Sequence, residues 1–308
     1  MSKIAFIFPG QGAQYIGMGK DFYENEKVSK EVYDLAGKTV GIDIAKLCFE
    51  ENKHLDITEY TQIAMLTTEV AILKALESKG IHSDVNAGLS LGEYAALAAS
   101  QVLSYEDVFR VVRKRGIFMQ EAVPVGGAMS AVLGLEAEKI EEICKQVNGI
   151  VSIANYNCPG QIVITGEENA VKDANDKLKE AGAKRTILLN VSGPFHSAML
   201  KEAGEQLGEV LKDIHILDFK TPYVSNVTAE YVTQKEEVKE LLKKQVSSSV
   251  CWQQSIEKMI KEGIDTFIEI GPGKTLTGFL RKINRNVKVY NIDKYEDLDH
   301  VVELLKAE

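Results

Sequence analysis

The feature that most constrains the fold is a serine between two glycines, Gly88-Leu89-Ser90-Leu91-Gly92, after a short apolar segment. This G-x-S-x-G pattern is typical of a nucleophile elbow, in which a strand turns sharply into a helix and holds the serine hydroxyl exposed on a strained backbone. The flanks agree, because residues 84–87 can end a strand and residues 93–99 are rich in helix formers. The pattern predicts an α/β fold in which Ser90 is a nucleophile. A purely structural turn is the alternative.

Length and composition limit the class of protein. A chain of 308 residues exceeds the usual single-domain size, so one large core with an insert, or two domains, is expected. No run of about 18 apolar residues occurs, so neither a signal peptide nor a membrane span is expected. The net charge of −9 argues against nucleic acid as the main partner. Four scattered cysteines without metal-ligand spacing favour reduced thiols in a cytoplasm.

Two glycine-rich loops resemble nucleotide-binding motifs, but their spacing does not fit. Pro9-Gly10-Gln11-Gly12 follows an expected strand, yet Tyr15 occupies the third glycine position of a dinucleotide fingerprint. The loop at residues 271–275 ends in Gly-Lys-Thr but lacks the first glycine of a P-loop, so we interpret it as a tight strand-to-helix turn. The backbone N–H of Gln11 could instead face an oxyanion; a plain turn is the alternative.

Two helices are expected on either side of the elbow. Residues 62–79 carry apolar residues at helical spacing and stop at Gly80, which fits a C-terminal cap. A second helix begins at Ser104, three residues before Asp107. Its basic residues would ordinarily form a solvated face; they are Arg110, Arg113, Lys114 and Arg115.

The pattern of expected strands and helices changes in the middle of the chain. Between residues 126 and 190 the expected order is β-α-β-β-α-β, the order of a ferredoxin-like unit, with a turn at 157–160 and a last strand at 185–191. The glycines and proline at Gly126-Gly127 and Gly193-Pro194 are suitable hinges between two bodies. The sequence therefore predicts an inserted subdomain.

His196 lies directly after the second hinge, in the turn Gly193-Pro194-Phe195-His196-Ser197. Clefts form at such junctions. An elbow serine needs a base that is neutral near pH 7, which makes His196 the preferred general base. A structural histidine is the alternative for this residue taken alone.

Six motifs, in order and spacing, make the chain resemble malonyl-CoA:acyl carrier protein transacylases over nearly its entire length. They are Phe8 to Gly12, Gly88 to Glu93, Arg115-Gly116, Asn157 to Gln161, Gly193 to His196, and Glu269 to Gly273. The resemblance implies an α/β-hydrolase-like large domain, residues 1–125 and 194–308, with an inserted ferredoxin-like subdomain, residues 126–193. It places the active site in the cleft between them.

The resemblance also implies roles for the residues that match its motifs. Ser90 corresponds to the nucleophile, His196 to its base, and Gln245 to a glutamine that orients the histidine in place of the acid of an ordinary triad.

Four further positions correspond to substrate-binding residues. Gln11 and Leu91 are the implied backbone oxyanion donors, and Arg115 is the implied partner of the malonyl carboxylate. Asn157 is implied as a cleft residue near the substrate.

The implied reaction is ping-pong transfer of a malonyl group from malonyl-CoA to the phosphopantetheine thiol of acyl carrier protein, which supplies the extender unit of fatty acid synthesis. No motif implies a metal or a bound cofactor, since coenzyme A belongs to the substrate and phosphopantetheine to the partner. The alternatives are a free-standing acyltransferase of a polyketide pathway, a serine thioesterase or esterase, and a non-catalytic carrier-binding subunit. Carrier proteins are acidic, so a local basic surface is expected, with Lys184, Arg185, Arg281, Lys282 and Arg285 as candidates.

The chain departs from the family pattern in two places. Leu89 stands where a histidine usually precedes the serine, and Ser249 replaces the proline of a frequent Ser-Pro-Val. We expect neither change to abolish activity. Phe195 before the histidine is the residue type of relatives that prefer malonyl over methylmalonyl groups, so bulkier extenders are expected to be disfavoured.

Overall fold

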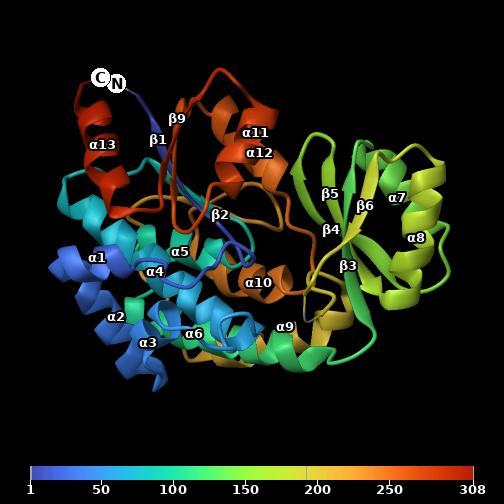
Figure 1. Cartoon of the computed structure of the whole chain (residues 1–308), viewed down its shortest axis with the longest axis horizontal. Helices are drawn as coiled ribbons and strands as arrows, with labels where there is room; N and C mark the ends of the chain where they lie inside the picture. Colours follow the sequence, from blue (N-terminus) through green and yellow to red (C-terminus); the bar gives the residue numbers. More distant parts are fainter. Residues whose placement is uncertain (1, 192, 308) are drawn as a thin grey trace.

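The computed structural model describes residues 2–191 and 193–307, arranged around two sheets. The larger sheet has six strands in the order β10-β9-β1-β2-β7-β8, parallel except for β8, and Figure 1 shows helices on both of its sides. Its strands are β1 (Ile4–Phe8), β2 (Val85–Gly88), β7 (Tyr223–Val224), β8 (Tyr231–Val232), β9 (Thr266–Ile270) and β10 (Lys288–Ile292).

Strand β1 shows why both faces of this sheet are covered. Phe6 and Phe8 belong to one apolar core, and the intervening Ala5 and Ile7 belong to a second core on the opposite face. A strand whose two faces are both apolar must be buried on both, which requires helices above and below the sheet.

The helices divide between these two cores. The second core receives α11 (Trp252–Lys261) and α12 (Thr275–Ile283). The first receives α1 (Lys20–Asn25), α2 (Lys27–Val40), α3 (Ile44–Phe49), α4 (Thr58–Ser78), α5 (Gly92–Ala99), α6 (Tyr105–Ala122), α9 (Lys201–Lys212), α10 (Lys235–Gln245) and α13 (Tyr295–Lys306); the short 3-10 helix η1 (Ala198–Leu200) precedes α9.

Helix α4 is central and buried on almost every side, because α2, α5 and α6 all pack against it. It begins at Thr58, four residues earlier than the sequence predicts, and ends before Gly80, which has the left-handed φ of 82° expected of a helix cap. The predicted start of α6 is confirmed, since the Ser104 hydroxyl accepts a hydrogen bond from the main-chain N–H of Asp107 at 3.1 Å.

The smaller sheet confirms the ferredoxin-like unit. Its four antiparallel strands lie in the order β4-β5-β3-β6, with two helices packed on them. The elements are β3 (Gly127–Leu133), α7 (Ala137–Lys145), β4 (Val151–Cys158), β5 (Gln161–Glu167), α8 (Glu168–Glu180) and β6 (Arg185–Leu188).

Two local predictions in this unit are wrong. Residue Asn157 lies inside β4 rather than in the turn, because bulges let the strand continue to Cys158. The last strand ends at Leu188, three residues early, because its pairing with β3 ends there.

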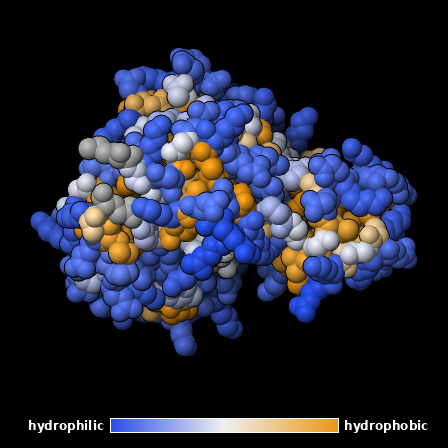
Figure 2. All heavy atoms as spheres, turned by 90° about the horizontal axis from the view of Figure 1, so that it is seen from above, coloured by the Kyte–Doolittle hydropathy of each residue, from blue (hydrophilic) through white to orange (hydrophobic). Residues whose placement is uncertain are grey.

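The smaller body projects from the larger one, and Figure 2 shows a mainly hydrophilic surface with scattered hydrophobic patches over both. The two connections between the bodies touch each other: a Cβ on Gly127 would come within 2.3 Å of the Pro194 ring. Domain boundaries at residues 126 and 193 stay a prediction. Among the described helices, none is long and apolar enough to cross a membrane.

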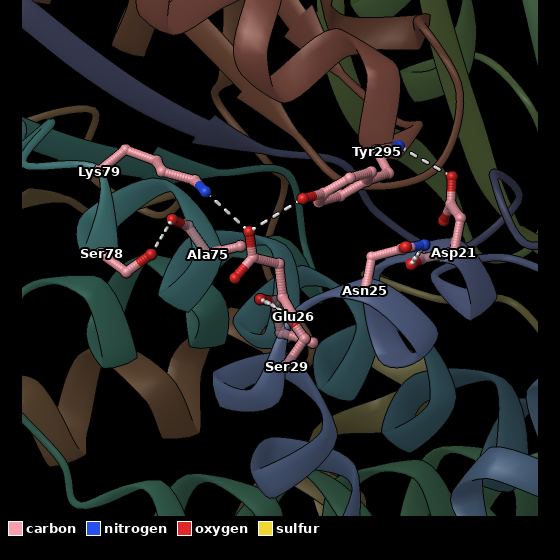
Figure 3. Close-up of polar contacts among 9 residues, drawn as sticks. Asp21, Asn25, Glu26, Ser29, Ala75, Ser78, Lys79 and Tyr295 are labelled. Carbon is pink, nitrogen blue, oxygen red and sulfur yellow. Dashed lines mark hydrogen bonds and ion pairs between the residues drawn. The ribbon is translucent and has the colours of Figure 1, made fainter.

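Polar contacts tie the C-terminal helix α13 to the N-terminal helices. Figure 3 shows Lys79 and Tyr295 both reaching the carboxylate of Glu26, at 2.8 and 3.2 Å, while the main-chain N–H of Tyr295 donates to Asp21 at 2.8 Å. These contacts join α13 to the junction of α1 and α2 and to the end of α4.

Candidate active site

The elbow has the predicted geometry. Strand β2 ends at Gly88, α5 begins at Gly92, and Ser90 between them has a left-handed φ of 55°. Both glycines are required by close packing: a Cβ on Gly88 would lie 1.9 Å from the carbonyl carbon of Gly92, and one on Gly92 would lie 2.2 Å from the carbonyl oxygen of Phe8. The backbone of β1 therefore presses directly on the turn that presents Ser90.

The histidine predicted as a base contacts the serine. The Oγ of Ser90 lies 2.7 Å from Nε2 of His196, and Nδ1 of His196 lies 2.9 Å from the main-chain oxygen of Gln245. A carbonyl can only accept, so Nδ1 carries the proton and Nε2 is free to accept one from the serine. Burial and the nearby charge of Arg115 lower the pKa of His196 to about 4, although the Gln245 carbonyl acts in the opposite direction. The imidazole is therefore neutral near pH 7.

Gln245, the last residue of α10, contacts the site in two ways. Its main-chain oxygen holds the histidine, as described above. Its side-chain amide donates to the main-chain oxygen of Ser90 at 2.8 Å and to the Glu93 carboxyl at 2.7 Å, while its side-chain oxygen accepts from Arg115 at 3.0 Å. The contact that orients the histidine is therefore made by the backbone, and the side chain is engaged elsewhere.

Arg115 is the buried member of the four basic residues on α6, with only 1% of its surface exposed. Its Nη1 donates to Gln62 at 2.7 Å, and its Nη2 lies 3.3 Å from Oγ of Ser90. Its guanidinium also stacks on the ring of Tyr94 at 5.3 Å. Within the described ranges it forms no ion pair, whereas Arg110 and Arg113 both do. A buried cation that has no ion-pair partner in the described part of the chain therefore lies beside the predicted nucleophile.

Two predicted oxyanion donors flank the serine. Gln11 and Leu91 line the same cavity as Ser90, and neither main-chain N–H donates to a protein acceptor in the part of the chain that the structure describes. The side chain of Gln11 is turned away and donates to the hydroxyl of Thr58 at 3.0 Å. Both N–H groups are therefore available to a bound oxyanion.

The cavity above Ser90 has a volume of about 280 Å³ and lies between the two bodies. Met129, Asn157 and Val163 line it from the smaller sheet. The side-chain oxygen of Asn157 is buried and has no hydrogen-bond partner within residues 2–191 and 193–307. Its walls are mostly apolar, with Met119, Leu189, Val191, Phe195, Leu276 and Phe279 contributing. Within residues 2–191 and 193–307, no group of three or more His, Cys, Asp or Glu side chains could hold a metal ion.

Sequence reasoning missed three residues that hold this arrangement. Asn226 accepts from the main-chain N–H of Ser90 at 2.7 Å and donates to the Gly88 carbonyl at 2.6 Å, so its carboxamide joins the end of β2 to the nucleophile residue. Gln62 positions the guanidinium described above. Glu93 is fully buried, and burial raises the pKa of its carboxyl to about 8.

Only weak signals pointed to these three residues. Glu93 belongs to the elbow motif itself, Asn226 follows a short strand, and Gln62 is one of several polar residues on its helix. None of these signals specifies a contact.

The fold and the site together define an acyl transfer enzyme with a serine nucleophile, because an elbow serine, a neutral histidine and two free N–H groups converge on one cavity. Comparison agrees: residues 5–296 match the family model described as "Acyl transferase domain".

Two full-length relatives carry the name of one enzyme. "Malonyl CoA-acyl carrier protein transacylase" of Bacillus subtilis is 47% identical and aligns over 100% of this chain and 99% of its own length. The protein of the same name from Staphylococcus aureus MW2 is 46% identical, with 97% and 98% covered. This chain belongs to the malonyl CoA-acyl carrier protein transacylase family.

Solved structures give the same result. The transacylase of Clostridium perfringens superposes with a TM-score of 0.96 at 46% identity, covering 99% of this chain and 98% of that one. A malonyl-transacylase in complex with its type II PKS acyl-carrier protein superposes with a TM-score of 0.96 at 37% identity, covering 98% and 100%. The predicted α/β architecture with its ferredoxin-like insert is therefore confirmed.

Proposed function

We propose that this protein transfers the malonyl group from malonyl-CoA to the phosphopantetheine thiol of an acyl carrier protein, supplying the extender unit for fatty acid synthesis. The observation that carries the proposal is Arg115, a buried guanidinium that lies 3.3 Å from Oγ of Ser90 and forms no ion pair with any described residue. Malonyl-CoA carries a carboxylate two bonds beyond its thioester carbonyl. Burying that charge unpaired would cost several kcal/mol, and an arginine can pair with the carboxylate through two parallel charge-assisted hydrogen bonds.

The first half-reaction loads the serine. Oγ of Ser90 attacks the thioester carbonyl and its proton passes to Nε2 of His196, 2.7 Å away. The N–H groups of Gln11 and Leu91 stabilise the oxyanion of the tetrahedral intermediate. When the intermediate collapses, the C–S bond breaks, and the departing coenzyme A sulfur takes the proton from His196.

The second half-reaction transfers the malonyl group from Ser90 to the carrier protein. The thiol of the carrier's phosphopantetheine gives its proton to His196 and its sulfur attacks the malonyl-Ser90 carbonyl. The C–O bond to the serine then breaks and Ser90 regains the proton. The enzyme returns to its starting state with no net change in charge or redox state.

The same cation accounts for substrate choice. A site built around a buried guanidinium discriminates strongly against acetyl-CoA, because the neutral acetyl group would leave Arg115 without a partner. The acyl group is held beside the nucleophile only when its carboxylate is present.

Acidic carrier protein is proposed to dock on a basic surface that spans both bodies. The Nζ of Lys282 on α12 donates to the side chain of Gln161 at 3.0 Å, at the turn of the smaller sheet. Lys184 lies against Gly134 at the same end of that sheet, and Gly134 donates to the Gly160 carbonyl there. Charges distant in sequence thus gather at this end of the smaller sheet, and Arg185, Arg281 and Arg285 adjoin them in the chain.

The rival hypotheses predict different chemistry. A serine thioesterase or esterase would release free malonate without a thiol acceptor, and a non-catalytic subunit would not react. Neither is favoured by relatives that are named as transacylases along their whole length.

The deciding experiment is intact-mass spectrometry with peptide mapping after mixing the protein with malonyl-CoA or acetyl-CoA. We expect a malonyl adduct on Ser90 that forms poorly with acetyl-CoA and disappears when phosphopantetheinylated carrier is added. Steady release of coenzyme A without an adduct would support the hydrolase, and no reaction would contradict catalysis altogether. A Ser90→Ala variant is the control for the site of modification.

We also propose that the reaction needs no bound metal or cofactor and takes place in the cytoplasm. The first part rests on the side chains at the site, which supply nucleophile, base and cation themselves. Prolonged treatment with a chelator should leave the loading rate unchanged, and a rate that falls and recovers with added metal would overturn it.

The proposed location in the cytoplasm rests on four free cysteines, because reducing compartments keep thiols unpaired; fractionation of the source cells tests it.

A further inference from the structure

A single carboxamide behind the nucleophile connects an acid to the arginine. The amide nitrogen of Gln245 donates to the carboxyl of Glu93 at 2.7 Å, and its oxygen accepts from Nη2 of Arg115 at 3.0 Å. All three side chains are buried, with exposed fractions of at most 1%. The proposed mechanism assigns no role to Glu93.

The orientation of this carboxamide is decided by what lies at each end. A guanidinium can only donate, so it must meet the oxygen, and the nitrogen must then point to acceptors. Its two hydrogens go to Glu93 and to the main-chain oxygen of Ser90. The carboxamide is thus held by Glu93, the Ser90 oxygen and Arg115 together, and removing Glu93 would leave one amide hydrogen without its 2.7 Å acceptor and loosen the hold on Arg115.

We propose that Glu93 is a positioning residue for malonyl selection: it accepts from the Gln245 amide and thereby holds the Arg115 guanidinium where the malonyl carboxylate arrives. This inference rests on the proposed function, in which Arg115 binds that carboxylate.

The environment of Glu93 agrees with such a role. An acid in the first turn of a helix ordinarily stabilises the helix from the solvent side. This one instead lies beneath the elbow. One of its oxygens has no hydrogen-bond partner among the residues that the structure describes, and the other also lies 3.4 Å from the main-chain nitrogen of Asn226. Simple helix capping does not account for a carboxyl placed there.

Two substitutions separate the proposed contact from other effects. Glu93→Met keeps the approximate size but removes the acceptor, while Glu93→Gln can keep an oxygen facing the Gln245 amide without a titratable group. Glu69→Met is a matched control, because Glu69 on α4 is equally buried and its carboxyl has no hydrogen-bond partner among the described residues. Circular dichroism and thermal unfolding establish that each variant is folded.

The measurement is the rate of Ser90 loading with malonyl-CoA and with acetyl-CoA over a range of concentrations. For Glu93→Met we expect a malonyl kcat/KM lower by about tenfold or more, mainly through KM, because a misplaced positioning group costs factors of this size. Acetyl loading should change by less than about twofold, since it does not use Arg115. Glu93→Gln should recover most of the malonyl rate, and Glu69→Met should keep the wild-type ratio.

Each other outcome is informative. Equal losses with both substrates would show a general structural role and overturn the inference, as would a Glu93→Gln variant no better than Glu93→Met. An unchanged ratio in Glu93→Met, with a selective wild type, would reject the inference alone. A wild type that loads acetyl as readily as malonyl would reject the proposed function instead.

Discussion

At the scale of single residues, the site depends on one strained serine and the groups that hold it. Ser90 has a left-handed backbone, which costs of order 1 kcal/mol for a non-glycine residue and persists only when its surroundings enforce it. The carboxamide of Asn226, bonded to the N–H of Ser90 and to the carbonyl of Gly88, supplies part of that enforcement. His196 also has a left-handed φ, 59°, so both partners of the 2.7 Å contact are held in uncommon conformations.

The charge and the shape of Arg115 can be tested separately. In Arg115→Lys the positive charge remains, but a point-like ammonium cannot form two parallel hydrogen bonds to a carboxylate. We expect malonyl loading to fall by roughly 10²-fold in kcat/KM, equivalent to about 3 kcal/mol, while acetyl loading is retained. Loading kinetics by mass spectrometry provide the measurement. Equal malonyl rates in the two proteins would show that charge alone suffices.

The buried histidine predicts an unusual pH profile. Burial and Arg115 lower the pKa of His196 to about 4 in the free enzyme, so the base stays deprotonated well below neutrality. Since kcat/KM reports the free enzyme, we expect malonyl loading to stay level as pH falls from 8 to about 5.5 and to decline only below that. A profile with half-maximal rate near pH 6.5 would contradict this.

The same shift affects stability. The folded state disfavours the protonated imidazole, so this contribution is fully present above the unfolded pKa of 6.5 and is lost as pH falls toward about 4. Its size is about 3 kcal/mol. Urea unfolding at several pH values, compared with a His196→Gln variant that cannot titrate, isolates it: the wild type should lose more stability than the variant across this window.

At the scale of elements, the nucleophile is placed by the packing of α5 onto β1. Gly92 has only hydrogen atoms on its Cα, and any larger side chain there would collide with the carbonyl oxygen of Phe8. The helix that follows the elbow can therefore lie directly on the neighbouring strand. Helices α5 and α6 both pack against the buried helix α4, which fixes their positions relative to each other. Arg115, on α6, is thereby placed next to Ser90.

A pair of glycine substitutions tests this close approach. In Gly92→Ala the new Cβ would lie 2.2 Å from the Phe8 oxygen, so the strand and helix must separate; we expect a loss of several kcal/mol and of most loading activity. Gly278→Ala is the matched control, because it also lies in a helix, α12, and its Cβ would meet no atom within 4 Å. It should be neutral or stabilising by up to about 1 kcal/mol. Thermal melts of both variants decide the point, and similar melting temperatures would refute it.

At the scale of the whole molecule, function depends on two bodies that meet over one cavity. The larger body contributes the Ser90, His196 and Arg115 side chains, while the smaller contributes part of the cavity wall and two of the five proposed docking residues, Lys184 and Arg185. An overall charge of −9 makes the position of that surface important, since an acidic carrier would be repelled elsewhere.

Charge reversal tests the docking surface. Lys282→Glu should raise the carrier KM in the unloading step several-fold, and more at low salt, while leaving the malonyl-CoA KM close to the wild-type value. Lys212→Glu on α9 is the control, because its lysine is also exposed but lies outside the proposed surface. A carrier KM insensitive to salt and to Lys282→Glu would reject this placement.

Sequence and structure contribute differently to this description. The elbow, the two-body order of elements and the hinge histidine could be predicted from the chain alone, because turns, caps and periodicity are local properties. The helix sequence alone did not distinguish Arg115 from its three basic neighbours, and only the family resemblance singled it out. Which of the four is buried depends on how the helix packs. The end of β4 was misplaced for a similar reason: bulges depend on the partner strand.

What the sequence by itself determined, then, is the strained turn at Ser90, the residue types that could serve it and the family pattern they form. Only the tertiary structure decided which groups surround it. Gln62, Glu93 and Asn226 come from different elements, and their hydrogen bonds exist only once the sheet and helices have packed. The physical reason is distance along the chain: local conformation follows neighbouring residues, whereas a buried polar network is selected by geometry between residues up to 155 positions apart.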